Sequence, residues 1–277
     1  MDFIAQAFGG PSSVSYLSTY YAILNLSKVM ILLGPRWADL PANRHHGATY
    51  DVFGKDSQNL LTEEIRIKSN GALPLLYETL TGIPVTAPRS LKMRDVYPYI
   101  SEVTTEYKLA TGSDALLGKL EIKAIQEKVP GLFHLEALAK PLGENVIQSV
   151  LRFPALRGWK KIPGSKNKYR SHSFPATGET MGTVVRTQID TRFFYIDPSA
   201  NRTTLCGQAF PMTEELPIFI LFFHLSNVVR YKPEFLEKLQ ESQFWPFVLT
   251  AKRHCLFRFI LLFWSWVHQK TYLIEQK

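Results

Sequence analysis

Two groups of histidine and arginine are the candidates for acid–base chemistry in this sequence. In the first, Arg44, His45 and His46 are consecutive, and Asp51 follows nearby. A histidine beside an arginine can move a proton on a phosphodiester while the arginine stabilises the developing negative charge. The alternative is that one imidazole packs under the helices and the other lies in solvent. No further ligand stands at a recognisable spacing, so we predict no metal site.

The second group is His224, Asn227 and Arg230, spaced three residues apart on an otherwise apolar segment. On a helix this spacing makes successive members neighbours. Polar groups on so apolar a helix need partners, either on a catalytic or ligand-binding face or in a buried hydrogen-bond network that joins helices. With the Arg44–His46 loop they form the predicted catalytic set if the protein cuts RNA. One histidine would then take the 2′-hydroxyl proton without a metal ion.

A third group is strongly basic. Between Asn145 and Gly178 there are seven lysines and arginines and no acidic residue, in a chain of net charge +8. Interleaved aromatic rings suit RNA or single-stranded DNA, because cations bind phosphates and rings stack on unpaired bases. The alternatives are a solvated loop or the docking of an acidic partner chain. The predicted nucleic-acid-binding residues are Arg157, Trp159, Lys160, Lys161, Lys166, Lys168, Tyr169 and Arg170.

Hydrophobic periodicity and turn residues predict the elements that position these groups. The predicted helices are Pro11–Leu33, Leu73–Leu80, Leu91–Tyr107, Ala115–Lys128, Phe133–Ala139, Pro217–Arg230, Pro233–Gln240 and Pro246–Tyr272. Arg36–Phe53 is rich in Pro, Asn, His and Gly and is predicted to be a loop. β-Branched and aromatic residues predict a meander of three strands. These strands are Thr183–Ile189, Arg192–Ile196 and Thr203–Cys206.

The predicted fold class is therefore mainly α, with a small antiparallel β insertion, in one domain over residues 1–277. Residues 1–145 and 213–277 are expected to be helical, with the basic loop and the meander between them at 146–212. Aromatic residues make up 13% of the chain, and that much ring surface must be buried in a core or against a partner. The aromatic helices around 216–230 and 246–272 therefore predict a homo-oligomer, with a symmetric dimer as the default.

Composition excludes several classes of protein. Two cysteines cannot build a disulfide framework, and no C-x-x-C pair is present to hold zinc. The start lacks a secretory signal, and the runs Leu216–Phe223 and Leu256–Val267 are shorter than the roughly 20 apolar residues that cross a bilayer. We expect a cytoplasmic protein without membrane contact. No phosphate-binding glycine loop, G-x-S-x-G or H-E-x-x-H motif is present, and no cofactor is predicted.

Two segments carry a resemblance to a known family. Tyr20–Lys28 (YYAILNLSK), followed by His45-His46-Gly47, and Leu225–Pro233 (LSNVVRYKP) resemble the bacterial YaaC-like proteins. The order of helical half, short β insertion and helical end is similar to that family across most of the chain. This resemblance implies a single YaaC-like domain.

The Tyr-Tyr-Ala helix before a His-His-Gly loop also resembles the front half of HEPN domains, which are helical bundles of toxin–antitoxin and antiviral systems. That resemblance implies a HEPN-like bundle, commonly dimeric, in a bacterial defence or toxin-type system. Active HEPN members are metal-independent ribonucleases with an arginine and, four to six residues later, a histidine, a spacing that this sequence lacks. Three hypotheses follow. The favoured one is a subunit that binds RNA or single-stranded DNA, and the others are a metal-independent endoribonuclease and an oligomeric scaffold recruiting a partner protein of the same operon.

Overall fold

The computed structural model describes residues 12–50, 59–113, 117–140, 159–165, 168–177, 195–196 and 213–268. The chain divides into two compact units. Unit 1 comprises Met1–Ala115 and Met212–Val267, and unit 2 comprises Leu116–Pro211 with the C-terminal residues from His268. The candidate catalytic residues therefore lie in unit 1 and the basic segment lies in unit 2.

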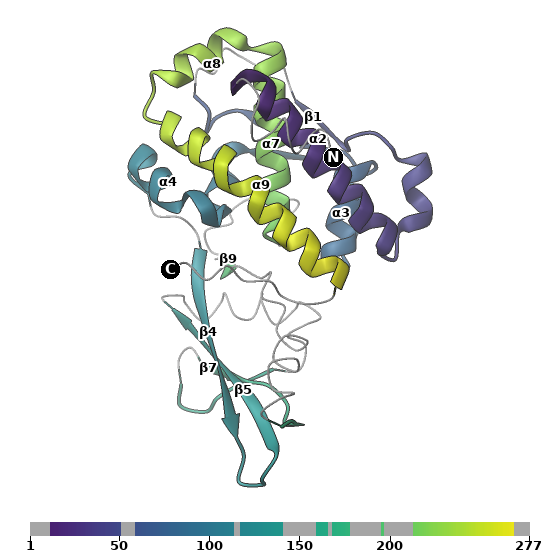
Figure 1. Cartoon of the computed structure of the whole chain (residues 1–277), viewed down its shortest axis with the longest axis vertical. Coiled ribbons are helices and arrows are strands. Elements are labelled where there is room, and N and C mark those ends of the chain that lie inside the picture. The colour runs from purple at the N-terminus through teal and green to yellow at the C-terminus, as the bar shows by residue number, and fades with distance from the viewer. Residues whose placement is uncertain are drawn as a thin grey trace. The chain divides into compact units, whose positions relative to one another are not determined.

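Helices form most of unit 1. α2 (Ser12–Leu33) packs against α7 (Glu215–Tyr231), and Figure 1 shows α9 (Trp245–His268) crossing in front of α7, with α8 (Pro233–Gln240) following α7. α3 (Ala72–Thr81) packs against α2, and α4 (Thr104–Thr111) lies against short 3-10 turns. The described 3-10 turns of this unit are η1 (Trp37–Ala42), η2 (Met93–Asp95), η3 (Tyr97–Tyr99) and η4 (Ser101–Val103), and α4 contacts η3 and η4. The helices predicted at 11–33, 73–80, 217–230, 233–240 and 246–272 are confirmed within the described residues.

The centre of unit 1 is α7, which packs closely against α2. Every residue of α7 from Glu215 to Val228 is buried, because its sequence is apolar on all sides. α2 supplies the opposing rings of Tyr16 and Tyr20, and α9 supplies Phe247 and Phe259, all fully or almost fully buried. The aromatic residues of the sequence thus form the core of this unit.

α2 contains a segment, Val14–Leu33, that is long and apolar enough to cross a membrane by its length and composition alone. More than half of its most apolar window, 56%, is buried inside the protein. The rings of Tyr16 and Tyr20 and the side chain of Met30 are among its buried groups. Such burial is typical of the core helix of a globular unit.

Unit 1 also holds a three-stranded antiparallel sheet in the order β1-β2-β3. The strands are β1 (Ala48–Tyr50), β2 (Glu64–Ile67) and β3 (Arg89–Lys92), with Tyr50 opposite Ile65 and Ile65 opposite Leu91. The prediction of a loop through 48–50 and of one helix over 91–107 was therefore wrong. Alternating burial of Ala48, Thr49 and Tyr50 is a strand pattern. Pro98, which lacks an amide hydrogen, lies in η3 and prevents one continuous helix over 91–107.

Unit 2 is built on a long antiparallel hairpin of β4 (Leu117–Gln126) and β5 (Leu132–Lys140). The sheet order is β6-β7-β5-β4-β9, and β8 (Phe174–Pro175) also pairs with β5. The other strands are β6 (Lys160–Lys161), β7 (Lys168–Arg170) and β9 (Tyr195–Ile196). Buried side chains of this unit include Leu135, Trp159, Tyr169 and Phe174.

The helices predicted at 115–128 and 133–139 are wrong, because both segments are strands. Lys119–Ala124 alternates charged and apolar residues, and this period of two is the signal of a strand. The β structure of unit 2 thus begins at Leu117 and not near residue 146. Of the predicted meander, only Tyr195–Ile196 falls on described residues, where it is β9 paired with Leu117–Gly118. The other predicted strands lie outside the described residues.

The mainly α class with small antiparallel sheets is confirmed. The HEPN-like character of the bundle stays a prediction.

Candidate functional site

The His45-His46-Gly47 loop is held against the start of α3 by its backbone. The carbonyl oxygens of His45 and His46 accept hydrogen bonds from the amides of Ala72 (2.8 Å) and Leu73 (3.0 Å). These amides belong to the first turn of α3, where no helical carbonyl is available to them. The loop therefore caps the helix, and this capping fixes the backbone position of His46.

Two glycines make that close approach possible. Gly71 has φ +108°, and a Cβ there would lie 2.4 Å from the Cα of Gly47 and 2.5 Å from Nδ1 of His45. Gly47 has φ +78°, and a Cβ there would lie 2.4 Å from Cδ of Pro74. Both positions combine a left-handed backbone with no room for a side chain, so both need glycine.

From this loop His46 reaches α2, where its Nδ1 lies 2.6 Å from the hydroxyl of Tyr20. Tyr20 is 1% exposed, and burial raises the pKa of its hydroxyl well above the usual range, so the phenol keeps its proton. Its hydrogen-bond partner among the described residues is Nδ1 of His46, and we assign Tyr20 as the donor of this bond because its hydroxyl keeps its proton. A neutral His46 must then carry its own proton on Nε2, which makes Nε2 a hydrogen-bond donor.

A cation completes the group, which we name the His46 cluster: Tyr20, Tyr21, His46 and Arg230. The guanidinium of Arg230 lies 5.6 Å from the ring centroid of Tyr21, and its Nη2 is 3.5 Å from the Tyr21 hydroxyl. Burial lowers the pKa of His46, and the charges of Arg230, Lys28 and His45 lower it further. No carboxylate in the described ranges pairs with Arg230.

The structure therefore divides the predicted catalytic set. It brings His46 and Arg230 into one half-buried cluster. Arg44 and His45 are exposed, and Nδ1 of His45 accepts a hydrogen bond from the Gly47 amide at 3.2 Å. Asn227 donates from Nδ2 to the Phe223 carbonyl of its own helix at 2.6 Å. The six residues therefore do not all lie in one group, because residues three apart on α7 face different neighbours, and the catalytic role of the set stays a prediction.

His224 belongs to a separate group, the Glu63 network: Tyr50, Glu63, Tyr97, His224 and Lys232. The Tyr97 hydroxyl lies 2.5 Å from Nδ1 of His224, whose Nε2 lies 2.8 Å from Oε2 of Glu63. Tyr50 also donates to Glu63, and Nζ of Lys232 lies 2.9 Å from Oε1. His224 and Tyr97 are fully buried, so a substrate cannot reach this histidine. Of the two alternatives for His224, the structure shows the buried network.

Burial raises the pKa of Glu63, but the hydrogen bonds from His224, Tyr50 and Lys232 outweigh it and lower the pKa to about 2. The carboxylate is thus charged and saturated with donors. The network joins the segment before β2, η3, α7 and the start of α8, and its role is structural.

A third polar group lies where α7 begins. Arg258 on α9 binds Glu214 through Nε and Nη2 at 2.6 and 2.8 Å, and Ser101 donates to the same carboxyl at 3.0 Å. Burial, together with Glu102 and Glu215, raises the pKa of Glu214 to about 8 against the effect of Arg258. Titration of Glu214 makes the stability of the core depend on pH. The group is buried, so a substrate cannot reach it.

In the basic segment the structure describes β6, β7 and the turn between them, except residues 166–167. Lys160, Lys161 and Lys168 are exposed. Arg170 is exposed too, but it forms an ion pair with Glu127. Trp159 and Tyr169 are 8% and 3% exposed, so both rings pack inside unit 2 and present little surface on which a base could stack. Arg157 and Lys166 lie outside the described residues.

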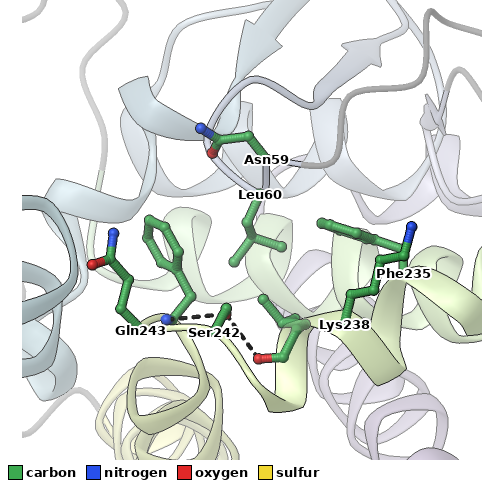
Figure 2. A pocket seen from close by; sticks show the side chains of 8 residues that line it. Asn59, Leu60, Phe235, Lys238, Ser242 and Gln243 are labelled. Atoms are coloured by element: carbon green, nitrogen blue, oxygen red, sulfur yellow. Dashed lines mark hydrogen bonds between the residues drawn. The ribbon is translucent and has the colours of Figure 1, made fainter.

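A pocket of about 360 Å³ lies beside α8 and the turn that leads to α9. Figure 2 shows Leu60 pointing toward α8, with the amides of Asn59 and Gln243 on one side and Lys238 on the other. Its lining contains no histidine, cysteine or carboxylate, and Lys238 is its titratable side chain. In the described ranges, no group of three or more His, Cys, Asp or Glu side chains could hold a metal ion.

The surface available for self-association differs from the predicted one. α7 is buried from Glu215 to Val228, whereas α9 exposes Phe257 (47%) and Trp264 (48%). These two residues are seven apart, which is two helical turns, so they lie on one face of α9. Self-association stays a prediction, now confined to α9.

Sequence reasoning missed Tyr20 and Tyr21 as site residues, although both stand in the Tyr20–Lys28 motif that carried the resemblance. Glu63 was missed as well, and no local pattern marks it. Its partners His224 and Lys232 are 161 and 169 residues away, so only the folded chain brings them together.

The fold and the site define a mainly helical protein with a second, antiparallel unit and a half-buried group of an arginine, a histidine and two tyrosines. Residues 1–267 match the family model of the YaaC-like proteins, and the chain belongs to that family. No match was found among curated proteins or among solved structures. The resemblance of Tyr20–Lys28 and Leu225–Pro233 to the YaaC-like proteins is thereby confirmed.

Proposed function

We propose that this protein binds RNA or single-stranded DNA and that the His46 cluster holds a phosphate group of the nucleic acid. The observation that carries the proposal is the half-buried guanidinium of Arg230, which lies on the Tyr21 ring next to the Tyr20–His46 pair and pairs with no carboxylate among the described residues. A half-buried cation without a counter-ion favours an anionic ligand, because the site has already given up part of its hydration.

The donor and acceptor pattern supports binding over catalysis. Tyr20 donates to Nδ1 of His46, so Nε2 of the neutral ring carries a hydrogen and cannot take a proton from a 2′-hydroxyl. Nε2–H and the guanidinium of Arg230 both donate hydrogen bonds. Such a pair suits phosphate oxygens, which only accept.

The exposed lysines of β6 and β7 supply further contacts in this proposal, since a nucleic acid neutralises several cations at once. The wider role that we propose, a subunit of a bacterial antiviral defence or toxin-type system, is supported by the HEPN-like features of the sequence, an argument by analogy.

The test is fluorescence anisotropy with a labelled single-stranded RNA that has hydroxyl ends, over a salt series. Arg230→Gln should weaken binding about tenfold or more, because a hydrogen bond to a charged group contributes roughly 1.5–3 kcal/mol. The slope of log affinity against log salt should fall by about 0.7 for the lost contact. Lys92→Gln, an exposed lysine on β3, is the matched control and should change neither quantity.

Equal affinities of wild type and Arg230→Gln at every salt concentration would show that the His46 cluster is not part of the binding surface. Absence of binding by the wild type at tens of micromolar (roughly −6 kcal/mol,) would overturn the function itself. Circular dichroism of each variant shows whether the fold is retained.

A further inference from the structure

We infer that unit 2 contains a second phosphate-binding site, formed by His134, Arg170 and Ser173. The side chain of Glu127 occupies this site in the free protein, and a phosphate group of the nucleic acid displaces it. We name the four residues the Glu127 site. The inference rests on the proposed binding of nucleic acid, to which it adds a contact point and a carboxylate that competes for it.

Three donor groups converge on one oxygen of Glu127. Nη2 of Arg170 donates to Oε1, and Oγ of Ser173 donates to the same atom at 2.9 Å. These bonds lower the pKa of Glu127, so its carboxylate is charged and only accepts hydrogen bonds. Nδ1 of His134 lies 2.9 Å from the same Oε1 and therefore carries a hydrogen. Nη2 and Nδ1 are 3.1 Å apart, so the donors surround a single point.

A phosphate group suits this point better than a carboxylate does. Glu127 contacts the three donors through Oε1. In the described part of the chain the guanidinium of Arg170 donates through Nη2, which leaves Nε and Nη1 for further oxygens. A phosphate can bind a guanidinium through two parallel bonds, which are charge-assisted and therefore strong. One phosphate oxygen in the position of Oε1 keeps all three bonds, and a second oxygen adds another.

The carboxylate of Glu127 can leave without opening the hairpin. Glu127 directly follows β4, and its amide donates to the carbonyl of Leu132 at 2.7 Å, so its backbone is held there. The side chains of Glu127 and Arg170 are 21% and 44% exposed, so a ligand can reach the ion pair. Exposed ion pairs contribute little to stability. Rotation of the Glu127 side chain is therefore enough to free the donors.

The Glu127 site adjoins the exposed lysines of β6 and β7. Lys160 lies opposite Arg170 in the register of the two strands, and directly opposite side chains are neighbours on one face of a sheet. Lys168 and Arg170 are exposed on either side of the buried Tyr169, so both side chains point to this face as well. A nucleic acid neutralises several cations at once, and these three lie together on one surface.

The experiment is a double-mutant cycle of Glu127→Gln and Arg170→Gln, with a labelled single-stranded RNA that has hydroxyl ends and fluorescence anisotropy as the readout. Glu127→Gln should raise the affinity about two- to fivefold, the range expected for an exposed ion pair. In the Arg170→Gln background the same substitution should change the affinity little, because the guanidinium that Glu127 blocks is absent. Glu64→Gln, an exposed glutamate on β2, is the control for net charge and should change nothing.

An equal gain from Glu127→Gln in both backgrounds would show a general effect of charge and overturn the inference. No gain from Glu127→Gln would make the carboxylate a structural tie of the hairpin and overturn it too. Both outcomes leave the proposed function standing if binding still depends on Arg230.

A second probe covers the case in which the wild type binds no RNA, which would overturn the proposed function. Inorganic phosphate is then titrated into Glu127→Gln while the NMR signals of the His134 ring are followed. A shift of these signals that Arg170→Gln abolishes would keep the Glu127 site as a site for free phosphate. Unchanged signals would overturn the inference together with the proposed function.

Discussion

Nε2 of His224 on α7 lies 2.8 Å from Oε2 of Glu63, a residue 161 positions earlier in the chain. The Tyr97 hydroxyl occupies the other ring nitrogen of the same histidine, and the Lys232 ammonium occupies the other carboxylate oxygen. The only histidine on α7, a helix buried from Glu215 to Val228, is thus saturated by partners inside the protein. This arrangement explains why a polar residue is tolerated there without a catalytic role.

The Glu63 network predicts an acid-dependent stability. The pKa of Glu63 is about 2 in the folded chain and about 4.5 when unfolded, so between these pH values the unfolded state binds more protons. Its contribution, roughly 3 kcal/mol, is therefore present above pH 4.5 and lost as the pH falls toward 2. Glu63→Gln should lose that amount at pH 7 in urea unfolding.

The matched control is Glu64→Gln, an exposed neighbour on β2 that should change the free energy of unfolding little. The gap between wild type and Glu63→Gln should close below pH 4. A gap of the same size at pH 7 and pH 3 would show that the loss comes from packing and not from the charged carboxylate.

Glu214 predicts the opposite slope at higher pH. Its pKa is raised to about 8 by burial, with Glu102 and Glu215 adding to the effect, so between pH 4.5 and 8 the folded state holds more protons than the unfolded state. Stability should fall as the pH rises through this window, by on the order of 5 kcal/mol from this group. Glu214→Gln should remove much of that decline, whereas Glu237→Gln, exposed on α8, should keep it. An unchanged decline in Glu214→Gln would assign it to other groups.

Because Gly71 and Gly47 are in contact, we predict that a side chain at Gly71 lowers both the stability of the His46 loop and the affinity for oligonucleotides. Gly71→Ala forces a side chain onto a φ of +108° and against the Cα of Gly47, and should cost at least about 2 kcal/mol. It should also weaken oligonucleotide binding, because His46 moves with the loop. Gly112→Ala is the control: its φ is +70°, but nothing lies within 4 Å of the new Cβ. Chemical denaturation and anisotropy measure the two effects, and normal binding by a folded Gly71→Ala variant would contradict the link.

The sequence predicted the long helices well because their signals are local. Pro11 and Gly34-Pro35 bound α2, and Pro233 begins α8 in its first turn. It failed at β4 and β5, where charged and apolar residues alternate over a span that also fits a short helix. Pairing between the two segments, with Leu120 opposite Ala139, makes both of them strands. This pairing cannot be seen in either segment alone.

The candidate site was predicted only in part, and for a similar reason. His46 and Arg230 attracted attention by residue type, but their meeting depends on α2 packing against α7. Their neighbour Tyr20 looked like an ordinary core ring, and its hydroxyl gains a role only beside Nδ1 of His46. Trp159 and Tyr169 looked like stacking surfaces because burial in a small sheet cannot be read from a basic segment.

The hairpin of β6 and β7 predicts a salt-dependent share of nucleic-acid binding. Replacing Lys160, Lys161 and Lys168 by Ala should flatten the slope of log affinity against log salt by up to about two units, at roughly 0.7 per lost contact. A control with Ala at Lys68, Lys92 and Lys238, all exposed in unit 1, removes the same charge. Equal slopes for the two triple variants would show that net charge, and not the hairpin, determines binding.

The last prediction concerns the metal-independent endoribonuclease. Because Nε2 of His46 carries a hydrogen and His224 is buried, we expect no cleavage when the purified protein is incubated with mixed RNA in EDTA. The parallel reactions contain His46→Ala and Arg230→Ala. Cleavage by the wild type that drops about a hundredfold in both variants, leaving cyclic phosphate ends, would contradict the expectation and make His46 a base. Cleavage of equal rate in all three reactions would come from a contaminating nuclease, since neither variant retains the cluster intact.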